Sequence, residues 1–298
     1  MKKNKLKIGY FADGPWSHEA FVKIVNDNRF DIKFIVPRTD TKDQALFKYS
    51  EKYGIDYFKL DNVNSQTSLE LISRYNCDVL VSMSFNQIFR KKIIDLTPIG
   101  IVNCHAGKLP YYRGRNILNW VLINDEKEFG ITVHFVDEGI DTGDIILQKS
   151  YPISDQDNYN TLLNVAYLEC SNILYDALVQ IAENIHQRIN QKKIHPIGFY
   201  CGMRSEGDEI INWNDTSRNI FNFIRSISKP GPIARTHMKS IVIKINNSNY
   251  INESLTYIGT CGQVLSKTES GFLVKTKDSF IEIYDIEGVI RVGDKLGK

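Results

Sequence analysis

Apolar residues follow two alternating patterns over the first half of the chain. Near-continuous apolar runs, such as those within Leu6–Ala12 and Cys77–Ser84, predict buried strands. Apolar residues spaced three and four apart predict amphipathic helices between them. Further strands are predicted at 32–36, 55–60, 100–106, 131–137 and 144–153, and helices at 18–27, 43–54, 68–76, 89–96 and 158–185. This alternation predicts an α/β fold, with a doubly wound, Rossmann-like, mostly parallel sheet covered on both faces.

The pattern changes after residue 200. Asn214 or Asp215 is expected to cap a helix at 216–227, just as Ser17 is expected to cap the first helix and Gly54 to end the second. From residue 240 the apolar residues alternate with period two, and strands are predicted at 240–245, 271–276 and 279–286. We therefore expect a catalytic domain at 1–200, a linker and helix at 201–239, and a smaller β-rich, barrel-like domain at 240–298.

Composition narrows the function classes. The 298 residues include 37 Lys or Arg and 35 Asp or Glu, and this net charge of +2 disfavours non-specific nucleic-acid binding. No apolar run reaches the roughly 18 residues that a membrane span needs. The five cysteines are odd in number and none is spaced as CxxC, which disfavours a disulfide framework or a zinc knuckle. A cytoplasmic protein is expected.

Common cofactor and nucleophile motifs are missing from the sequence. No GxGxxG follows the first predicted strand, and the Gly–Lys at 107–108 lacks the spacing of a phosphate-binding loop. There is no HExxH zinc motif and no GxSxG nucleophile elbow. Dinucleotide binding, zinc hydrolysis and serine-nucleophile chemistry are therefore disfavoured.

One region concentrates polar groups that suit acyl transfer. Asn103 and His105 alternate at the end of a predicted buried strand, and the loop 137–144 after a later strand contains four acidic residues and two glycines. Both segments can meet at one edge of the sheet. An amide and an imidazole can stabilise an oxyanion, while a carboxylate orients the imidazole and helps to take up a proton. His134, in mid-strand, is expected to be a buried strand histidine.

These residues also carry a family resemblance. The segments NCHAGKLPYYRG and GITVHFVDEGIDTGDIILQ resemble formyltransferases that use 10-formyltetrahydrofolate, and the resemblance extends over about the first 190 residues. It implies that Asn103, His105 and Asp141 are catalytic, that 10-formyltetrahydrofolate is the cosubstrate and that no metal is used. The implied folate contacts are Ser84, Phe85, Asn86, Ile88, Val136, Gly139, Ile140 and Asp144; the candidate acceptor contacts are Trp16, Lys108, Tyr111, Tyr112, Arg113 and Arg115.

The resemblance leaves the acceptor amine open. Residues 210–232 are similar to the linker of methionyl-tRNA and sugar N-formyltransferases, although Asn212 replaces the Asp that usually precedes the tryptophan, here Trp213. The stretch 36–54 lacks the glycine-rich basic insertion of the tRNA enzymes. Residues 206–298 hold 12 Lys or Arg and 11 Asp or Glu, a net charge of +1.

Both observations favour a nucleotide-linked amino sugar as the acceptor, such as a dTDP- or UDP-4-amino-4,6-dideoxyhexose for surface polysaccharide such as O-antigen. Methionyl-tRNA formyltransferase is the alternative. A binding module without catalysis is disfavoured because the whole trio is present. No nucleic-acid or membrane partner is expected, and the alternating strands of the tail leave a homodimer open.

Overall fold

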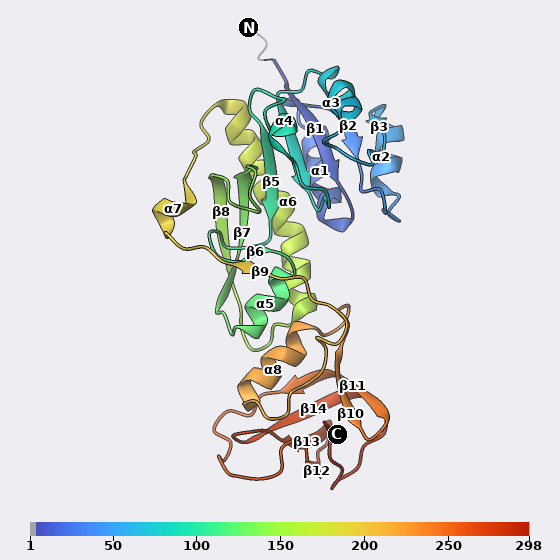
Figure 1. Ribbon diagram of the computed structural model, residues 1–298, viewed down its shortest axis with the longest axis vertical. Helices are drawn as coiled ribbons and strands as arrows, with labels where there is room; N and C mark the ends of the chain where they lie inside the picture. The colour runs from blue at the N-terminus through green and yellow to red at the C-terminus, as the bar shows by residue number, and fades with distance from the viewer. Residues whose placement is uncertain (1–3, 298) are drawn as a thin grey trace. The chain divides into compact units, whose positions relative to one another are not determined.

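The computed structural model describes residues 4–297 and divides into two compact units (Figure 1). The first unit takes the chain up to Gly114, together with Phe129–Tyr151 and Asn164–Tyr200. The second unit takes Arg115–Glu128, Pro152–Leu163 and the chain from Cys201 onward. Each unit therefore draws on segments that are far apart in the sequence.

The first unit is built on a seven-stranded sheet in the order β3-β2-β1-β4-β5-β7-β8. Strands β3, β2, β1, β4 and β5 pair in parallel, whereas β7 runs antiparallel to β5. The strand order reverses between β1 and β4, where α/β sheets usually bind ligands. The strands are β1 (Leu6–Ala12), β2 (Phe30–Val36), β3 (Asp56–Tyr57), β4 (Val79–Met83), β5 (Ile101–His105), β7 (Glu128–Phe135) and β8 (Ile145–Pro152).

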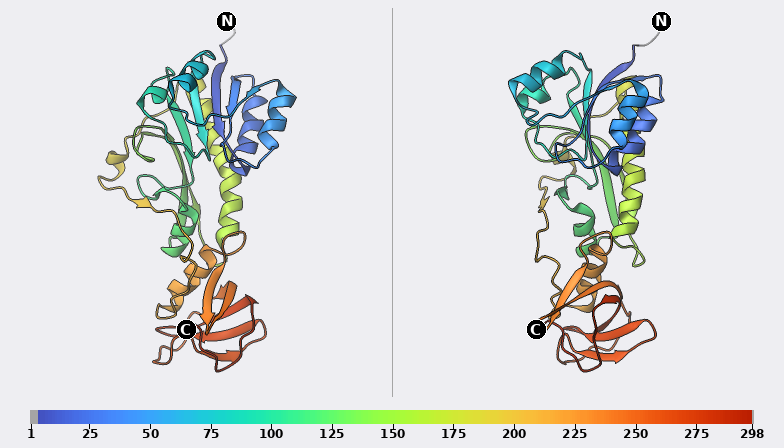
Figure 2. Two further views of the ribbon diagram at one scale, coloured as in Figure 1. Left: turned by 45° about the vertical axis from the view of Figure 1, so that its right-hand side comes forward. Right: turned by 90° about the vertical axis from the view of Figure 1, so that its right-hand side faces the viewer.

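Helices cover both faces of this sheet, with α3 on the opposite side from α1 and α6 (Figure 2). The period of two along β1 explains this arrangement. Tyr10 contacts Phe21 of α1, whereas the next residue, Phe11, joins a cluster that contains Leu69 of α3. The helices are α1 (Pro15–Val25), α2 (Ala45–Tyr53), α3 (Gln66–Ser73), α4 (Lys91–Ile94), α6 (Tyr159–Glu183) and α7 (Gln191–Ile194).

The second unit holds a five-stranded antiparallel sheet and two helices. The order is β10-β11-β14-β13-β12, and α8 (Ser217–Ser226) contributes Ile220, Phe221 and Ile224 to its core. Its strands are β10 (Ala234–Met238), β11 (Ile241–Asn249), β12 (Val264–Lys267), β13 (Gly271–Lys275) and β14 (Phe280–Glu287). The predicted α/β fold with a smaller β-rich domain is confirmed. Among residues 4–297, no helix combines the length and apolarity needed to cross a bilayer.

Two predicted helix caps are wrong. Helix α1 begins at Pro15, whose fixed φ suits a first turn, and Ser17 lies inside the helix and donates to the Gly14 carbonyl at 2.8 Å. The cap of α8 is Thr216, whose side chain accepts from the Asn219 N–H. Asp215 instead accepts from the Thr216 N–H at 2.7 Å, one residue too early to cap the helix. The predicted helix end at Gly54 is confirmed, with a left-handed φ of 65°.

Several elements were not predicted. Helix α5 (Ile117–Ile123) is a short apolar run, and periodicity alone does not distinguish such a run from a buried strand. The two-residue strands β6 (Arg113–Gly114) and β9 (Tyr200–Cys201) pair with each other, and the predicted strand at 55–60 is only Asp56–Tyr57. These short pairings depend on tertiary contacts rather than on sequence pattern.

Candidate active site

The antiparallel pairing of β5 with β7 brings polar side chains together in the middle of an apolar sheet. Asn103 is in register with His134, and His105 with Thr132. Asn103 and His105 lie two residues apart on one strand and therefore point to the same face. His105 and His134 are only 9% and 2% exposed, so their polar atoms need partners within the protein.

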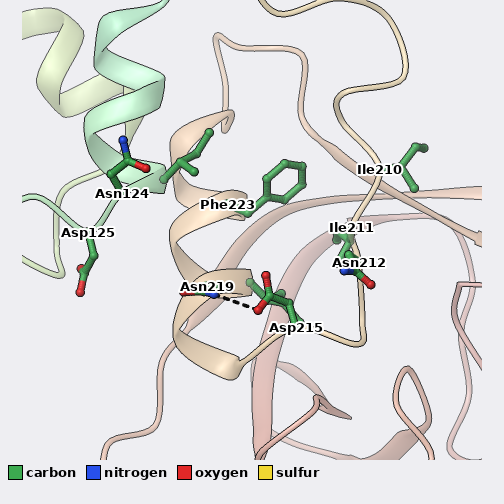
Figure 3. A pocket seen from close by; sticks show the side chains of 10 residues that line it. Asn124, Asp125, Ile210, Ile211, Asn212, Asp215, Asn219 and Phe223 are labelled. Carbon is green, nitrogen blue, oxygen red and sulfur yellow. Dashed lines mark hydrogen bonds between the residues drawn. The ribbon is translucent and has the colours of Figure 1, made fainter. Parts of the chain in front are cut away.

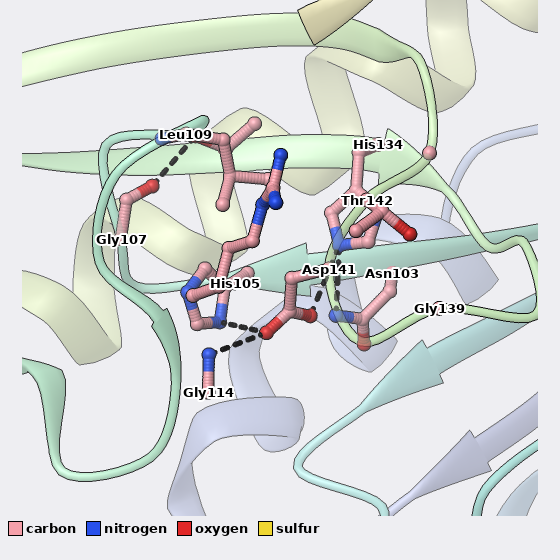
Figure 4. Close-up of polar contacts among 12 residues, drawn as sticks. Asn103, His105, Gly107, Leu109, Gly114, His134, Gly139, Asp141 and Thr142 are labelled. Carbon is pink, nitrogen blue, oxygen red and sulfur yellow. Dashed lines mark hydrogen bonds and ion pairs between the residues drawn. The ribbon is translucent and has the colours of Figure 1, made fainter. Parts of the chain in front are cut away.

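Asp141 supplies a negative charge to this cluster from the loop that follows β7 (Figure 4). Its Oδ2 lies 3.6 Å from His105 Nδ1 and accepts a hydrogen bond of 2.9 Å from the Gly114 N–H. Its Oδ1 lies 3.4 Å from His134 Nε2, which lies 3.3 Å from Asn103 Nδ2. The structure thus brings together Asn103, His105 and Asp141, and adds His134 to them.

The cluster keeps Asp141 ionised. Burial of the carboxyl group raises its pKa, but the His105 charge, the His134 hydrogen bond and charge, and the Gly114 N–H outweigh that effect. The pKa of Asp141 therefore lies well below its ordinary value. A carboxylate that is only 13% exposed and remains charged can orient a neighbouring imidazolium and attract a proton.

Backbone carbonyls fix which nitrogen of each imidazole ring carries a proton, because a carbonyl oxygen can only accept a hydrogen bond. His105 Nε2 donates to the Tyr112 carbonyl at 2.7 Å, which leaves Nδ1 facing Asp141. His134 Nδ1 donates to the Phe135 carbonyl at 2.8 Å. A neutral His134 then accepts from Asn103 through Nε2, whereas a protonated His134 donates to Asp141. His134 Nε2 therefore lies within reach of both Asn103 Nδ2 and Asp141 Oδ1.

Glycine and backbone strain shape the loops around these rings. A Cβ at Gly107 would lie 2.3 Å from His105 Nε2 and 2.4 Å from the Tyr112 carbonyl oxygen. Asp141 and Tyr112 both adopt left-handed backbone conformations, with φ of 53° and 54°. Such conformations cost about 1–3 kcal/mol and persist where the surrounding contacts hold them.

Comparison with known proteins identifies the family of this chain. Residues 15–178 match the family described as Formyl transferase, and residues 204–289 match the Formyl transferase C-terminal domain. The chain belongs to the formyltransferase family. The predicted family resemblance is therefore confirmed.

The names of the sequence relatives and the descriptions of the similar solved structures point to different acceptors. Methionyl-tRNA formyltransferase of Fusobacterium nucleatum is 32% identical over 232 residues, covering 77% of this chain and 73% of that protein. The Syntrophus aciditrophicus enzyme of the same name is 30% identical over 237 residues, covering 79% of this chain and 74% of that protein.

Among solved structures, WlaRD, a sugar 3N-formyltransferase in the presence of dTDP and 5-N-formyl-THF, matches with a TM-score of 0.72 and 23% identity over 96% of this chain and all of that chain. An N-formyltransferase from Helicobacter canadensis, in complex with folinic acid and dTDP-3-aminofucose, matches with a TM-score of 0.70 and 22% identity over 95% of this chain and 100% of that chain. At these identities the likeness establishes the fold.

The predicted folate residues of the formyltransferase lie on two loops, after β4 and after β7. Phe85 and Val136, one from each loop, pack against the same apolar cluster. Ile88 and Ile140 remain 60% and 50% exposed, which is unusual for large apolar side chains. Ser84 has a left-handed backbone conformation, with a φ of 57°. The other three residues have hydrogen-bond partners: the Asn86 side chain lies 3.4 Å from the Asp40 carboxylate, the Gly139 N–H donates to Asp137, and the Asp144 carboxylate accepts from Asn190.

The predicted acceptor residues divide into three groups. Tyr111 and Tyr112 both contact the Phe199 ring, at 5.7 and 4.9 Å between centroids. Trp16 packs edge-on against a tyrosine of α6, and the backbone and side-chain stem of Lys108 lie where a Cβ on Gly130 would clash. Arg113 hydrogen-bonds Gln191, whereas Arg115 belongs to the second unit and lies 3.5 Å from Met203 Sδ. Of these residues, Tyr112 contacts His105, through its backbone carbonyl, and Tyr111 and Arg113 flank it in the sequence.

Sequence reasoning missed two residues of this network. His134 is buried as predicted, but its register with Asn103 makes it part of the polar cluster. Gln191 contacts the Asp141 loop from α7, and no motif distinguishes it within its polar segment. The strand pairing was the only signal that could have found His134.

Two of the cysteines are unsuited to act as nucleophiles, and the described residues form no metal site. Burial raises the pKa of the Cys77 thiol to about 12 and that of Cys201 to about 11, so both remain protonated. Within residues 4–297, no group of three His, Cys, Asp or Glu side chains could hold a metal ion.

A pocket of about 450 Å³, lined by residues such as Asp125, Asp215 and Phe223, lies entirely within the second unit (Figure 3).

Proposed function

We propose that this formyltransferase transfers the formyl group of 10-formyltetrahydrofolate to the amine of a nucleotide-linked amino sugar. The expected acceptor class is a dTDP- or UDP-4-amino-4,6-dideoxyhexose. The single observation that carries the chemistry is the buried, ionised Asp141 carboxylate beside His105 and His134, with Asn103 in the same cluster. The enzyme would act in the cytoplasm, for surface polysaccharide such as O-antigen. A homodimer stays a prediction.

The reaction needs no nucleophilic side chain because the acceptor amine attacks the formyl carbon directly. A new C–N bond forms and the carbonyl oxygen becomes an oxyanion. Collapse of this intermediate breaks the bond to N10 of the folate. The amine loses a proton and N10 gains one, so the net task of the side chains is to move this proton and stabilise the oxyanion.

Asn103 and His105 are the oxyanion donors in this proposal. The Asn103 amide has a second N–H beyond the one that faces His134, and that N–H can donate to the formyl oxygen. His105 Nε2–H donates to the Tyr112 carbonyl, so donation to substrate requires this bond to be exchanged. Asp141 orients His105 and helps to remove the proton from the amine.

Aromatic side chains beside His105 support a nucleotide-linked acceptor. Tyr111 lies 5.4 Å from the His195 ring and 5.7 Å from Phe199. Phe199 and Tyr200 are 40% and 54% exposed, and the Arg113 guanidinium lies 5.6 Å from the Tyr200 ring centre. Exposed aromatic faces stack nucleobases, and guanidinium groups bind phosphates.

Methionyl-tRNA is the second candidate acceptor because the 30–32% identical relatives are methionyl-tRNA formyltransferases. Charge disfavours it. Residues 206–298 carry 12 basic and 11 acidic residues, a net charge of +1, and RNA-binding surfaces need a basic excess. In the loop between β2 and α2, Arg38 is paired with Asp40 at 2.9 Å rather than left to attract phosphate.

An acceptor panel tests the proposal. The purified enzyme is incubated with 10-formyltetrahydrofolate and dTDP- or UDP-4-amino-4,6-dideoxyhexoses, and with charged initiator tRNA in parallel. Tetrahydrofolate release and the mass of each acceptor are measured. The proposal predicts the gain of one formyl group on a nucleotide sugar. Formylation of methionyl-tRNA alone would contradict it.

A further inference from the structure

We infer that Gln191 is a positioning residue that holds the Asp141 loop in its working conformation. The inference rests on the proposed role of Asp141 and concerns a residue that does not touch the reacting atoms. Gln191 is the first residue of α7 and is only 2% exposed. A buried amide of this kind needs partners for both its donors and its acceptor.

Gln191 uses its whole side-chain amide. Nε2 donates to the carbonyl oxygens of Asp141 and Gly143, both at 2.8 Å. Oε1 accepts from Arg113 Nη2 at 2.6 Å and from Arg113 Nε at 3.2 Å. The arrangement cannot be reversed, because a flipped amide would place its oxygen against two carbonyls and its N–H groups against a guanidinium. The amide therefore has a single orientation.

The neighbours of Gln191 hold the same loop. Ile189 and Ile145 exchange backbone hydrogen bonds of 2.8 and 2.9 Å. Asn190 Nδ2 donates to Asp144 Oδ1 at 3.2 Å. The three consecutive residues 189–191 thus bind successive points of the chain from Ile145 back to Asp141.

Arg113 connects Gln191 to the other side of Asp141. Arg113 directly precedes Gly114, whose N–H donates to Asp141 Oδ2. Gly198 leaves the space for this connection, since a Cβ there would lie 2.7 Å from Arg113 Cζ and 2.5 Å from the Pro110 carbonyl oxygen. Asp141 is therefore held through its main chain by Gln191 and through its carboxylate by Gly114.

This double attachment accounts for the strained backbone of Asp141. Its φ of 53° is stable only where contacts on both sides fix it. Loss of the two Gln191 donors would free the Asp141 carbonyl and let the carboxylate move away from His105. A displacement of about 1 Å can lower a rate about 100-fold. The two hydrogen bonds end on Asp141 and Gly143, neither of which is among the proposed folate or acceptor contacts.

Gln191→Glu is the sharpest test because it keeps the length of the side chain and its pairing with Arg113. It replaces the two donors by an oxygen that repels the carbonyls of Asp141 and Gly143, and it adds one negative charge, which the matched control below also adds. We expect kcat to fall about 10–100-fold, with the KM of both substrates within about twofold. Gln187→Glu makes the same change at an exposed glutamine four residues earlier and should leave kcat within about twofold.

The assay uses 10-formyltetrahydrofolate with dTDP-4-amino-4,6-dideoxyglucose, or with initiator methionyl-tRNA where that is the acceptor. Thermal unfolding is followed in parallel, and Gln191→Met is the second variant if Gln191→Glu does not fold. A kcat within about threefold of wild type in the folded variant would overturn the inference. Asp141→Asn distinguishes a failure of the proposed role of Asp141 from a failure of the positioning role of Gln191. If Asp141→Asn is fully active, the proposed role of Asp141 fails. If Asp141→Asn is inactive while Gln191→Glu is active, only the positioning role of Gln191 fails.

Discussion

Each unit of this formyltransferase contains a polar network built around aspartate, and the two networks differ in geometry. In the second unit, Arg218 donates to Asp125 through Nε at 3.1 Å and to Asp155 through Nη1 at 2.7 Å. In the first unit, Asp141 lies 3.6 Å from His105 and 3.4 Å from His134. The contacts of the arginine network in the second unit are short and involve a permanent positive charge. The contacts of the histidine network in the first unit are longer and involve imidazoles, which can gain or lose a proton.

The two networks lower the pKa of an aspartate for different reasons. Asp125 has a pKa of about 2, chiefly because Arg218 donates hydrogen bonds to it, and its side chain is 36% exposed. Asp141 has a lowered pKa despite its burial, because two imidazoles and a backbone N–H act on it. Arginine keeps its charge at every physiological pH, whereas histidine does not. The comparison is consistent with the proposed proton-transfer role of the histidine network, whereas the arginine network needs no role beyond stability.

The largest effect that tests this contrast is expected from Asp141→Asn. An amide keeps the shape of the carboxylate but cannot hold a proton or orient an imidazolium. We expect kcat to fall by about 10²–10⁴ in a variant that is still fully folded at the assay temperature. Single-turnover formyl transfer and thermal unfolding measure the two quantities. Near-normal turnover in the folded variant would remove Asp141 from the mechanism.

Gly107→Ala should produce the next largest effect. The new Cβ would lie 2.3 Å from His105 Nε2, so the ring must leave the Tyr112 carbonyl. We expect a loss of about 10–100-fold in kcat. Gly202→Ala is the matched control, because no atom lies within 4 Å of the Cβ that it adds. Equal kinetics for the two variants would contradict the placement of His105.

The pH dependence of stability should distinguish the buried aspartate from its amide variant. Because the pKa of Asp141 is lower in the folded protein than in the unfolded chain, the ionised carboxylate stabilises the fold above the unfolded value of about 4. This contribution is lost as the pH falls through that value toward the folded pKa. Below about pH 4, wild type should lose unfolding free energy relative to Asp141→Asn as the pH falls. Denaturant titrations at each pH measure it, and a difference that moves in the opposite direction on acidification contradicts the assignment.

The smallest effect is expected in the arginine network. Arg218→Met removes the cation that Asp125 and Asp155 share but keeps most of the apolar stem. Because the two carboxylates are 36% and 51% exposed, solvent screens the pairs, and we expect a loss of no more than about 1 kcal/mol. Urea unfolding measures the loss. The kcat should stay within about twofold of wild type, and a fall as large as that of Gly107→Ala would erase the contrast between the networks.

The sequence predicts the buried strands well because continuous apolar runs of β1, β4 and β5 have few alternative structures. It also indicates Asn103 and His105, since polar residues at a strand end stand out from an apolar background, whereas only the family resemblance distinguishes Asp141 from the three other acids of its loop. It does not indicate α5, because its seven residues are apolar on nearly every side. Short local pairings such as β6 with β9 are equally invisible.

His134 and Gln191 escaped prediction for a different physical reason. His134 enters the site through the antiparallel register of β7 with β5, which depends on how the chain returns after α5. Gln191 reaches Asp141 from 50 positions along the chain. Neither contact has a local sequence pattern, because each is set by the fold and not by the neighbouring residues.

The most direct test of the account is a competition between the two candidate acceptors in one reaction. Equal concentrations of dTDP-4-amino-4,6-dideoxyglucose and initiator methionyl-tRNA are mixed with the enzyme and a limiting amount of radiolabelled 10-formyltetrahydrofolate. The ratio of label in the two products gives the ratio of kcat/KM values directly. The account predicts label on the nucleotide sugar in an excess of about 100-fold or more. Label on methionyl-tRNA instead would contradict it.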